Sequence, residues 1–219
     1  MASKHLDELT AFLRPAGGGV YVVSTGVAEQ QALQQALYGA QRPDDIEAAW
    51  RRALGRLHQA RVVVLGVPSD AGAGFTRGAN RAPAALRAHL LRQPDHPLRA
   101  PDVVDVGDVR VIPHLLSEEM LSPAQIAECR AALYGDPHRA LPVSPLALAE
   151  RALDALAVLA PGAVPVVLGG DHSVGWPAFA AAWRRHERDG GRRLGLLHFD
   201  AHTDLLPHRL GVRYCFATW

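Results

Sequence analysis

The sequence predicts an α/β protein, a three-layer α/β/α sandwich around a parallel sheet. Apolar runs rich in valine recur along the chain, for example "RVVVLGVP" (61–68) and "AVPVVLGG" (163–170). Runs of this kind are typical of parallel strands that are covered on both faces. Between them lie segments with helical spacing of apolar residues, such as "SPLALAERALDALAVLA" (144–160). Alternating strands and helices indicate βαβ units and hence a parallel sheet.

The expected elements continue this alternation from residue 61 onward. Strands are expected at 61–68, 102–109, 163–170 and 193–200, and helices at 83–93, 144–160 and 173–190. Pro83 suits the first turn of its helix, and Ser144 followed by Pro145 is a typical helix start. A polar, glycine-rich loop (69–83) follows the first of these strands.

Residues 1–60 show a different pattern and are expected to form an N-terminal helical extension of an α/β domain that spans residues 61–219. Leu6, Leu9 and Leu13 recur at helical spacing. Further helices are expected at 27–38 and 44–59, and a short strand at "VYVVSTG" (20–26). No catalytic pattern occurs here, so we expect a packed or oligomer-contacting arm.

Composition excludes several classes of protein. The chain has 219 residues, of which 48% are hydrophobic and 21% charged, as in ordinary globular proteins. A net charge of +1 gives no indication of nucleic-acid or membrane-surface binding. Cys129 and Cys215 are far apart, which argues against a disulfide scaffold and fits a reducing compartment. The N-terminus lacks an apolar leader and no run is long enough to span a membrane, so a cytoplasmic protein is expected.

Polar side chains follow the predicted strands at their carboxyl ends, where ligands bind in open α/β sheets. Asp171 and His172 follow one strand, and Asp200, His202 and Asp204 follow the last. Carboxylates and imidazoles without a thiolate suit manganese, iron, cobalt or zinc. The sequence therefore predicts a metal site at this edge of the sheet.

Spacing restricts how the segment "HFDAHTD" (198–204) can bind metal. In a straight strand Asp200 and Asp204 would be about 13 Å apart. Paired metals in hydrolytic sites are only about 3.5–4 Å apart. The strand should therefore end near Asp200, and the chain should curl so that the ligands converge. His198 lies further back, and we expect it to be a packed or hydrogen-bonded neighbour of the ligands.

The segment "GGDHS" (169–173) supplies the other part of the predicted site. Its two glycines permit a tight turn and close backbone approach. His172 then projects from the start of a helix and is expected to be a ligand. Asp171 is expected in a supporting role, such as orienting an imidazole.

These motifs together resemble the ureohydrolase (arginase/agmatinase) superfamily. "GGDHS" precedes "HFDAHTD" by one βαβ unit, and the upstream loop is similar to the family's glycine-rich loop at Gly72, Arg77, Gly78, Ala79 and Pro83. The resemblance covers residue 61 to about residue 205. It implies an arginase-like sandwich and two Mn²⁺ ions that activate a hydroxide, which attacks a guanidino carbon and releases urea.

The resemblance also assigns roles residue by residue. His172 would bind one metal, Asp200 would bridge both, His202 would bind the second, and Asp204 would return to the first. Asp204 is also a candidate to accept a proton during catalysis. His208 is the candidate for proton transfer, because relatives carry a histidine soon after this motif. Asp70 is a candidate substrate contact.

The chain departs from the family pattern at its C-terminal end. A third motif, of the form Ser-x-Asp-x-Asp-x-x-Asp-Pro, supplies two further aspartates in the family, whereas residues 205–219 contain no Asp or Glu. Four of six expected protein ligands are thus present, and the last strands are expected to be missing, as in the N-terminal part of a longer enzyme.

The first functional hypothesis is therefore a cytoplasmic, homo-oligomeric hydrolase of small guanidino compounds, of the agmatinase or arginase type, with agmatinase slightly preferred. One alternative is a catalytically incomplete metal-binding scaffold or fragment. Another is a formiminoglutamase-type hydrolase, which would share the metals and differ in its substrate pocket.

Overall fold

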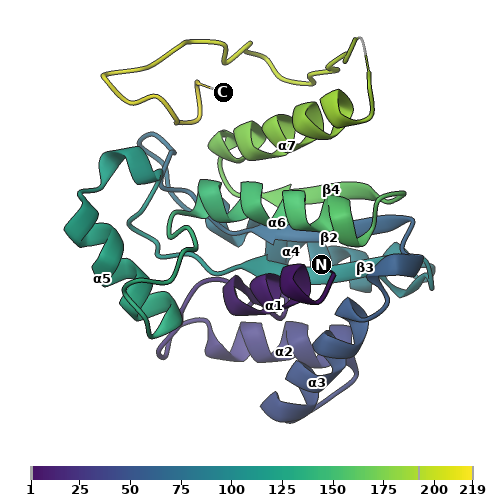
Figure 1. Ribbon diagram of the computed structural model, residues 1–219. Coiled ribbons are helices and arrows are strands. Elements are labelled where there is room, and N and C mark those ends of the chain that lie inside the picture. The colour runs from purple at the N-terminus through teal and green to yellow at the C-terminus, as the bar shows by residue number, and fades with distance from the viewer. Residues whose placement is uncertain (1, 192, 219) are drawn as a thin grey trace.

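The computed structural model describes residues 2–191 and 193–218, and these form a four-stranded sheet with the order β1-β3-β2-β4 (Figure 1). The strands are β1 (Leu13–Arg14), β2 (Val62–Val67), β3 (Val103–Val109) and β4 (Val164–Gly169). β2 runs parallel to both β3 and β4, and the short β1 is antiparallel to β3. The predicted α/β class with a mostly parallel sheet is confirmed.

Helices cover both faces of the sheet (Figure 1). They are α1 (Ala2–Phe12), α2 (Val27–Tyr38), α3 (Pro43–Leu54), α4 (Ala82–Leu91), α5 (Pro123–Tyr134), α6 (Pro145–Leu159) and α7 (Gly175–Arg188). α6 packs against α1 and α7, whereas α4 packs against α2 and the strands β2 and β4. No helix of the described residues has the length and apolar character needed to cross a membrane.

Short 3₁₀ turns connect several of these elements. They are η1 (Leu57–Gln59), η2 (Ala79–Arg81), η3 (Pro97–Arg99), η4 (Glu118–Met120) and η5 (His172–Val174). η2 ends the glycine-rich loop and leads directly into α4, and η5 joins β4 to α7. Both turns thus lie in loops that follow strands β2 and β4.

The N-terminal segment packs into the same hydrophobic core as the rest of the chain. Leu9, Phe12 and Leu13 are fully buried and belong to one cluster with Val63 of β2 and Leu148 of α6. The expected helices of this segment are present as α1, α2 and α3. The packed arm expected from the sequence is therefore an integral part of the core, while the proposed boundary at residue 60 stays a prediction.

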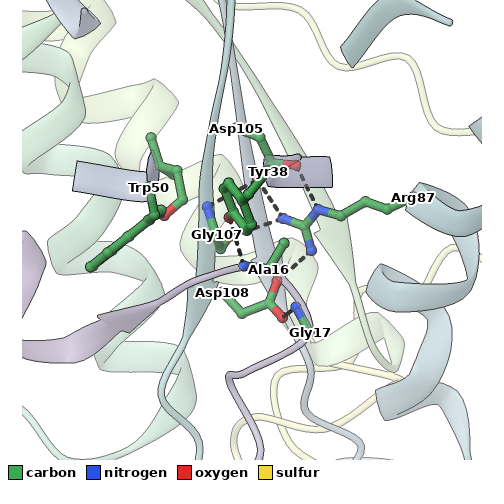
Figure 2. A network of polar contacts seen from close by, with 9 residues as sticks. Ala16, Gly17, Tyr38, Trp50, Arg87, Asp105, Gly107 and Asp108 are labelled. Carbon is green, nitrogen blue, oxygen red and sulfur yellow. Dashed lines mark hydrogen bonds and ion pairs between the residues drawn. The ribbon is translucent and has the colours of Figure 1, made fainter. Parts of the chain in front are cut away.

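A buried ion-pair network joins Arg87 of α4 to Asp105 and Asp108 of β3 (Figure 2). Arg87 is fully buried, and its Nε and Nη2 donate to the two carboxylate oxygens of Asp105 at 2.7 and 2.9 Å. Its Nη1 donates to Asp108 at 2.5 Å. Burial by itself lowers the pKa of Arg87, but the two carboxylates more than offset this and raise it above its usual value.

Backbone groups complete the network (Figure 2). The N–H of Gly17 donates to the second oxygen of Asp108 at 2.7 Å, and Arg87 also donates to the carbonyl of Gly107 at 3.0 Å. A glycine is required at position 66, because a Cβ there would lie 1.9 Å from Asp108 Oδ1. The network therefore fixes α4, which begins where the glycine-rich loop ends.

One sequence expectation concerning a minor element is wrong, and one helix was not predicted. Residues 20–26 form no strand, and only Val20 makes an isolated bridge, with Val111. Helix α5 was not anticipated, because only Leu133 among its residues is buried and the helix carries little apolar periodicity. Its start was visible in the sequence as a capping box, in which Ser122 and Gln125 bond to each other's backbone.

The strand expected at 193–200 is also absent, since residues 193–199 have no regular secondary structure. Phe199 and Leu197 are 96% and 86% exposed. In Figure 1 this part of the chain runs past α7, on the side away from β4. The apolar run favours a strand, but a strand forms only where a neighbour satisfies its backbone groups. Among the described residues, β4 pairs on one side only.

Candidate functional site

The end of β4 brings His172 to the carboxyl edge of the sheet. Gly170 lies directly against the loop after β2, because a Cβ at this position would be 1.7 Å from the carbonyl oxygen of Ser69. The N–H of Asp171 donates to the same oxygen at 3.0 Å. His172 then begins η5, which the Asp171 side chain caps by accepting the N–H of Ser173 at 2.8 Å.

The segment after residue 199 curls as the distance argument requires. The carboxylate of Asp200 accepts the backbone N–H of His202 at 3.0 Å, which forms a tight local turn. Asp204 has a positive φ of 51°, a left-handed conformation that aspartate tolerates better than most residues. This conformation lets the chain reverse direction within the segment 200–204.

Side chains from the two segments converge. His172 Nδ1 lies 2.6 Å from Asp204 Oδ2 and 3.5 Å from Asp200 Oδ2. His198 Nε2 lies 3.7 Å from Asp200 Oδ2, and the rings of His172 and His198 are 5.2 Å apart. One possible metal-ligand atom each from His172, His198 and Asp200 lies within 4.8 Å of the other two. We call His172, His198, Asp200 and Asp204 the His172 cluster.

His202 lies at the edge of this arrangement. Its Nδ1 is 3.7 Å from Asp200 Oδ1, and its side chain is 81% exposed. Of the four expected ligands, His172 therefore contacts both Asp200 and Asp204, and His202 lies near Asp200. His198, expected as a supporting neighbour, lies as close to Asp200 as His202 does.

The electrostatics of the cluster favour an ionised Asp200. The backbone N–H of His202, which donates to Asp200, lowers the pKa of the Asp200 carboxyl. Desolvation opposes this effect, and the nearby imidazoles of His172, His198 and His202 add to it. Asp200 is thus held in the charged form that binds a cation.

Two further candidates lie outside the cluster. The carboxylate of Asp70 accepts the N–H of Gly78 at 2.7 Å, and its carbonyl accepts the Arg77 guanidinium and the N–H of Ala73. Asp70 therefore closes the glycine-rich loop upon itself. His208 is exposed, and no ion pair of the described residues joins it to the cluster.

Sequence reasoning singled out Asp171 as a supporting residue but missed two buried serines near it, Ser69 and Ser173. Ser69 Oγ, Asp171 Oδ2 and Ser173 Oγ are buried without a hydrogen-bond partner among the described residues. Buried polar atoms normally have partners, so this group marks a place of functional interest. Ser69 was detectable in principle, since it follows β2 at the sheet edge where ligands bind.

Comparisons with known proteins identify the family of this chain. Residues 60–219 match the arginase family. An agmatinase of Chromobacterium violaceum is 30% identical over 179 residues, which cover 80% of this chain and 48% of the relative. A guanidinopropionase of Pseudomonas aeruginosa is 33% identical over 148 residues, which cover 66% of this chain and 37% of the relative.

Among solved structures, proclavaminate amidino hydrolase from Streptomyces clavuligerus aligns with a TM-score of 0.49 and 25% identity. The alignment covers 74% of this chain and 46% of that protein. The present chain thus spans about half the length, or less, of the relatives that it matches.

Proposed function

The chain belongs to the arginase family, and we propose that it is a metal-dependent hydrolase that cleaves a guanidino C–N bond and releases urea. The observation that carries this proposal is the convergence of His172 with Asp200 and Asp204, from segments that lie 28 and 32 residues apart in the sequence. An imidazole and two carboxylates at one sheet edge form a donor set suited to manganese.

The spacing of the donor atoms supports a metal site. Ligands of one octahedral ion with bonds of about 2.1 Å lie about 3 Å from each other. The distances of 2.6 and 3.5 Å from His172 Nδ1 to the two aspartates bracket that value. We propose that His172, Asp200, His202 and Asp204 would hold two Mn²⁺ ions.

His198 offers an alternative to His202 as ligand. Both imidazoles lie 3.7 Å from an oxygen of Asp200, His198 from Oδ2 and His202 from Oδ1. His198 is the less exposed of the two, with 25% of its side chain accessible. We keep His198 as the residue that supports Asp200, and a comparison of His198→Ala with His202→Ala decides between the two assignments.

The remaining steps of the proposed reaction belong to the chain's own groups. When bound, divalent cations lower the pKa of a water molecule enough for it to attack the guanidinium carbon. The carboxylate of Asp204 would accept the released proton. His208 is the candidate that returns a proton to the departing amine. The products are urea and the amine.

Manganese binding and urea release test the proposal together. We expect about two equivalents of Mn²⁺ per chain and urea from at least one member of a panel of agmatine, arginine and guanidino acids. His172→Ala should weaken Mn²⁺ binding at least ~10-fold, because it removes a ligand. His58→Ala, at an exposed histidine of η1, is the matched control.

The outcomes separate an enzyme from an inactive scaffold. Mn²⁺ binding without urea from any substrate would favour the metal-binding scaffold. Binding that is equally strong in His172→Ala and in the wild type would contradict the ligand assignment. The cytoplasmic location and homo-oligomeric state expected from the sequence stay predictions.

A further inference from the structure

A cavity of about 610 Å³ opens between the glycine-rich loop and the C-terminal segment. Its walls come from residues 71–75, from residues 114–117 and 120–121 on either side of Glu118 and Glu119, and from five residues of the C-terminal segment: Arg209, Leu210, Val212, Cys215 and Phe216. The backbone N–H of Phe216 donates to the carbonyl of Gly72 at 3.2 Å and so joins the first wall to the third. The volume is within the range of small-molecule sites.

One wall of this cavity packs against the turn that carries His172, although none of the four cluster residues lines the cavity. Gly72 lines the cavity, and a Cβ at this position would lie 2.8 Å from Ser173 Oγ and 3.0 Å from Asp171 Oδ1. These two residues flank His172 in sequence and lie in the same turn. The cavity is therefore the neighbouring space that the far end of a substrate could occupy when its guanidino group is at the cluster.

Arg209 is the only charged side chain among the described residues that line the cavity. Its Cζ lies 4.8 Å from the centroid of the Phe216 ring. Such stacking fixes the guanidinium plane while leaving its N–H edges able to bind a carboxylate with two hydrogen bonds. No ion pair within the described chain includes Arg209.

Acidic groups near the cavity are already engaged. The carboxylate of Asp70 bonds to Gly78, and Glu119 lies 4.0 Å from Arg213, outside the cavity lining. Residues 205–219 contain no acidic side chain. The cavity therefore offers a cation and no free carboxylate, which suits an anionic ligand group and disfavours an ammonium group.

We propose that Arg209 binds a carboxylate at the far end of the substrate, so that the substrates are guanidino acids and not guanidino amines such as agmatine. This inference rests on the proposed function, because it takes the His172 cluster as the place where the guanidino group binds. Arg209 is then a specificity-determining residue that contacts the non-reacting end of the substrate. The apolar walls contributed by Leu116 and Met120 accommodate the methylene chain.

The test measures the binding of guanidinobutyrate and of agmatine to the Mn²⁺-loaded chain by calorimetry, with urea release recorded in parallel. Wild type should bind guanidinobutyrate at least ~10-fold more tightly than agmatine. Arg209→Gln should lose about 10- to 100-fold in affinity for guanidinobutyrate, the usual effect of losing hydrogen bonds to a charged group. Arg209→Glu should reverse the preference.

Arg213→Glu is the matched control, because Arg213 stacks on Tyr214 outside the cavity lining. It should leave both affinities within about twofold, since exposed charge pairs contribute little. Arg209 is exposed, so its variants should keep the wild-type circular dichroism spectrum.

The measurements also separate this inference from the proposed function. If guanidinobutyrate binds through Arg209 but no urea forms, the proposed hydrolase activity fails and the carboxylate site stands. If urea forms from agmatine at least as readily as from guanidinobutyrate, or if Arg209→Gln binds guanidinobutyrate like wild type, the inference is wrong and the hydrolase assignment survives.

Discussion

The Arg87 network and the His172 cluster both contain two carboxylates, but they differ in how many of the carboxylate oxygens have hydrogen-bond or ion-pair partners. In the Arg87 network, both carboxylates bond to the guanidinium or to backbone N–H groups, and every member is buried. In the His172 cluster, two carboxylates face imidazoles at 2.6–3.7 Å and the side chains remain accessible to solvent. The first arrangement is closed and stabilises the fold. The second still has donor atoms directed toward one another, as a metal site requires.

The largest effect is expected from Arg87→Met. Removing the guanidinium leaves Asp105 and Asp108 buried without a counter-charge, which typically costs about 3–5 kcal/mol in the free energy of unfolding. Urea denaturation measures this loss. Arg61→Met, at an exposed pair with Asp102, is the control and should change stability by less than about 1 kcal/mol. A loss below about 1 kcal/mol in Arg87→Met would show that the network contributes no more than a surface pair.

A smaller loss is expected from Gly72→Ala, at the boundary between the His172 cluster and the cavity. The added Cβ would lie 2.8 Å from Ser173 Oγ, in a fully buried position, and overpacking of this kind costs about 1–3 kcal/mol. The control is Gly74→Ala, whose Cβ meets the Phe216 ring at 3.4 Å. In thermal unfolding, Gly72→Ala should have a clearly lower melting temperature than Gly74→Ala. Equal melting temperatures would contradict the close contact between position 72 and Ser173.

The sequence predicted the closely packed parts of the fold better than the exposed ones. Strands β2 and β3 and the cap of α6 at Ser144 follow from local pattern, because each buried run and each cap carries its own signal. Strand β4 forms where it was predicted, but its first three residues are exposed and the others half-buried, so the cover expected on both of its faces is missing among the described residues. The strand expected at 193–200 fails because pairing depends on a neighbour that the local pattern does not specify. Helix α5 was missed for the opposite reason, since a mostly exposed helix has little apolar periodicity.

The candidate site was predictable in its residue types and only partly in its geometry. The distance argument correctly required a curl after Asp200, because alternation in an extended strand separates ligands too widely. It placed His198 behind His202, whereas both imidazoles lie 3.7 Å from Asp200, because the segment before Asp200 does not pair with the sheet. The partners of Arg87 were invisible too, because Asp105 and Asp108 look like breaks in an apolar strand until α4 is packed beside them.

The pH dependence of Mn²⁺ binding tests the His172 cluster, the one of the two clusters that is proposed to bind metal. Metal ligands must be deprotonated, so protons compete with Mn²⁺ for the imidazole and carboxylate groups of the site. Mn²⁺ affinity should therefore fall as pH falls, by at least ~10-fold between about pH 7.5 and pH 5.5. Titrations of Mn²⁺ at the two pH values measure this. An affinity that does not change with pH would exclude His172 as a ligand.

The smallest effect is expected from Arg184→Met. This variant tests whether the number of charges or their burial determines how much the Arg87 network stabilises the fold. Arg184 on α7 also pairs with two carboxylates, Glu150 and Asp154 of α6. Its side chain is 37% exposed, however, so water solvates the charges whether or not they are paired. We expect a loss of less than about 1 kcal/mol that shrinks further in about 1 M salt, since salt screens exposed pairs. Because both arginines have two acidic partners, a loss as large as that of Arg87→Met would mean that the number of charges, and not their removal from water, sets the energy of these networks.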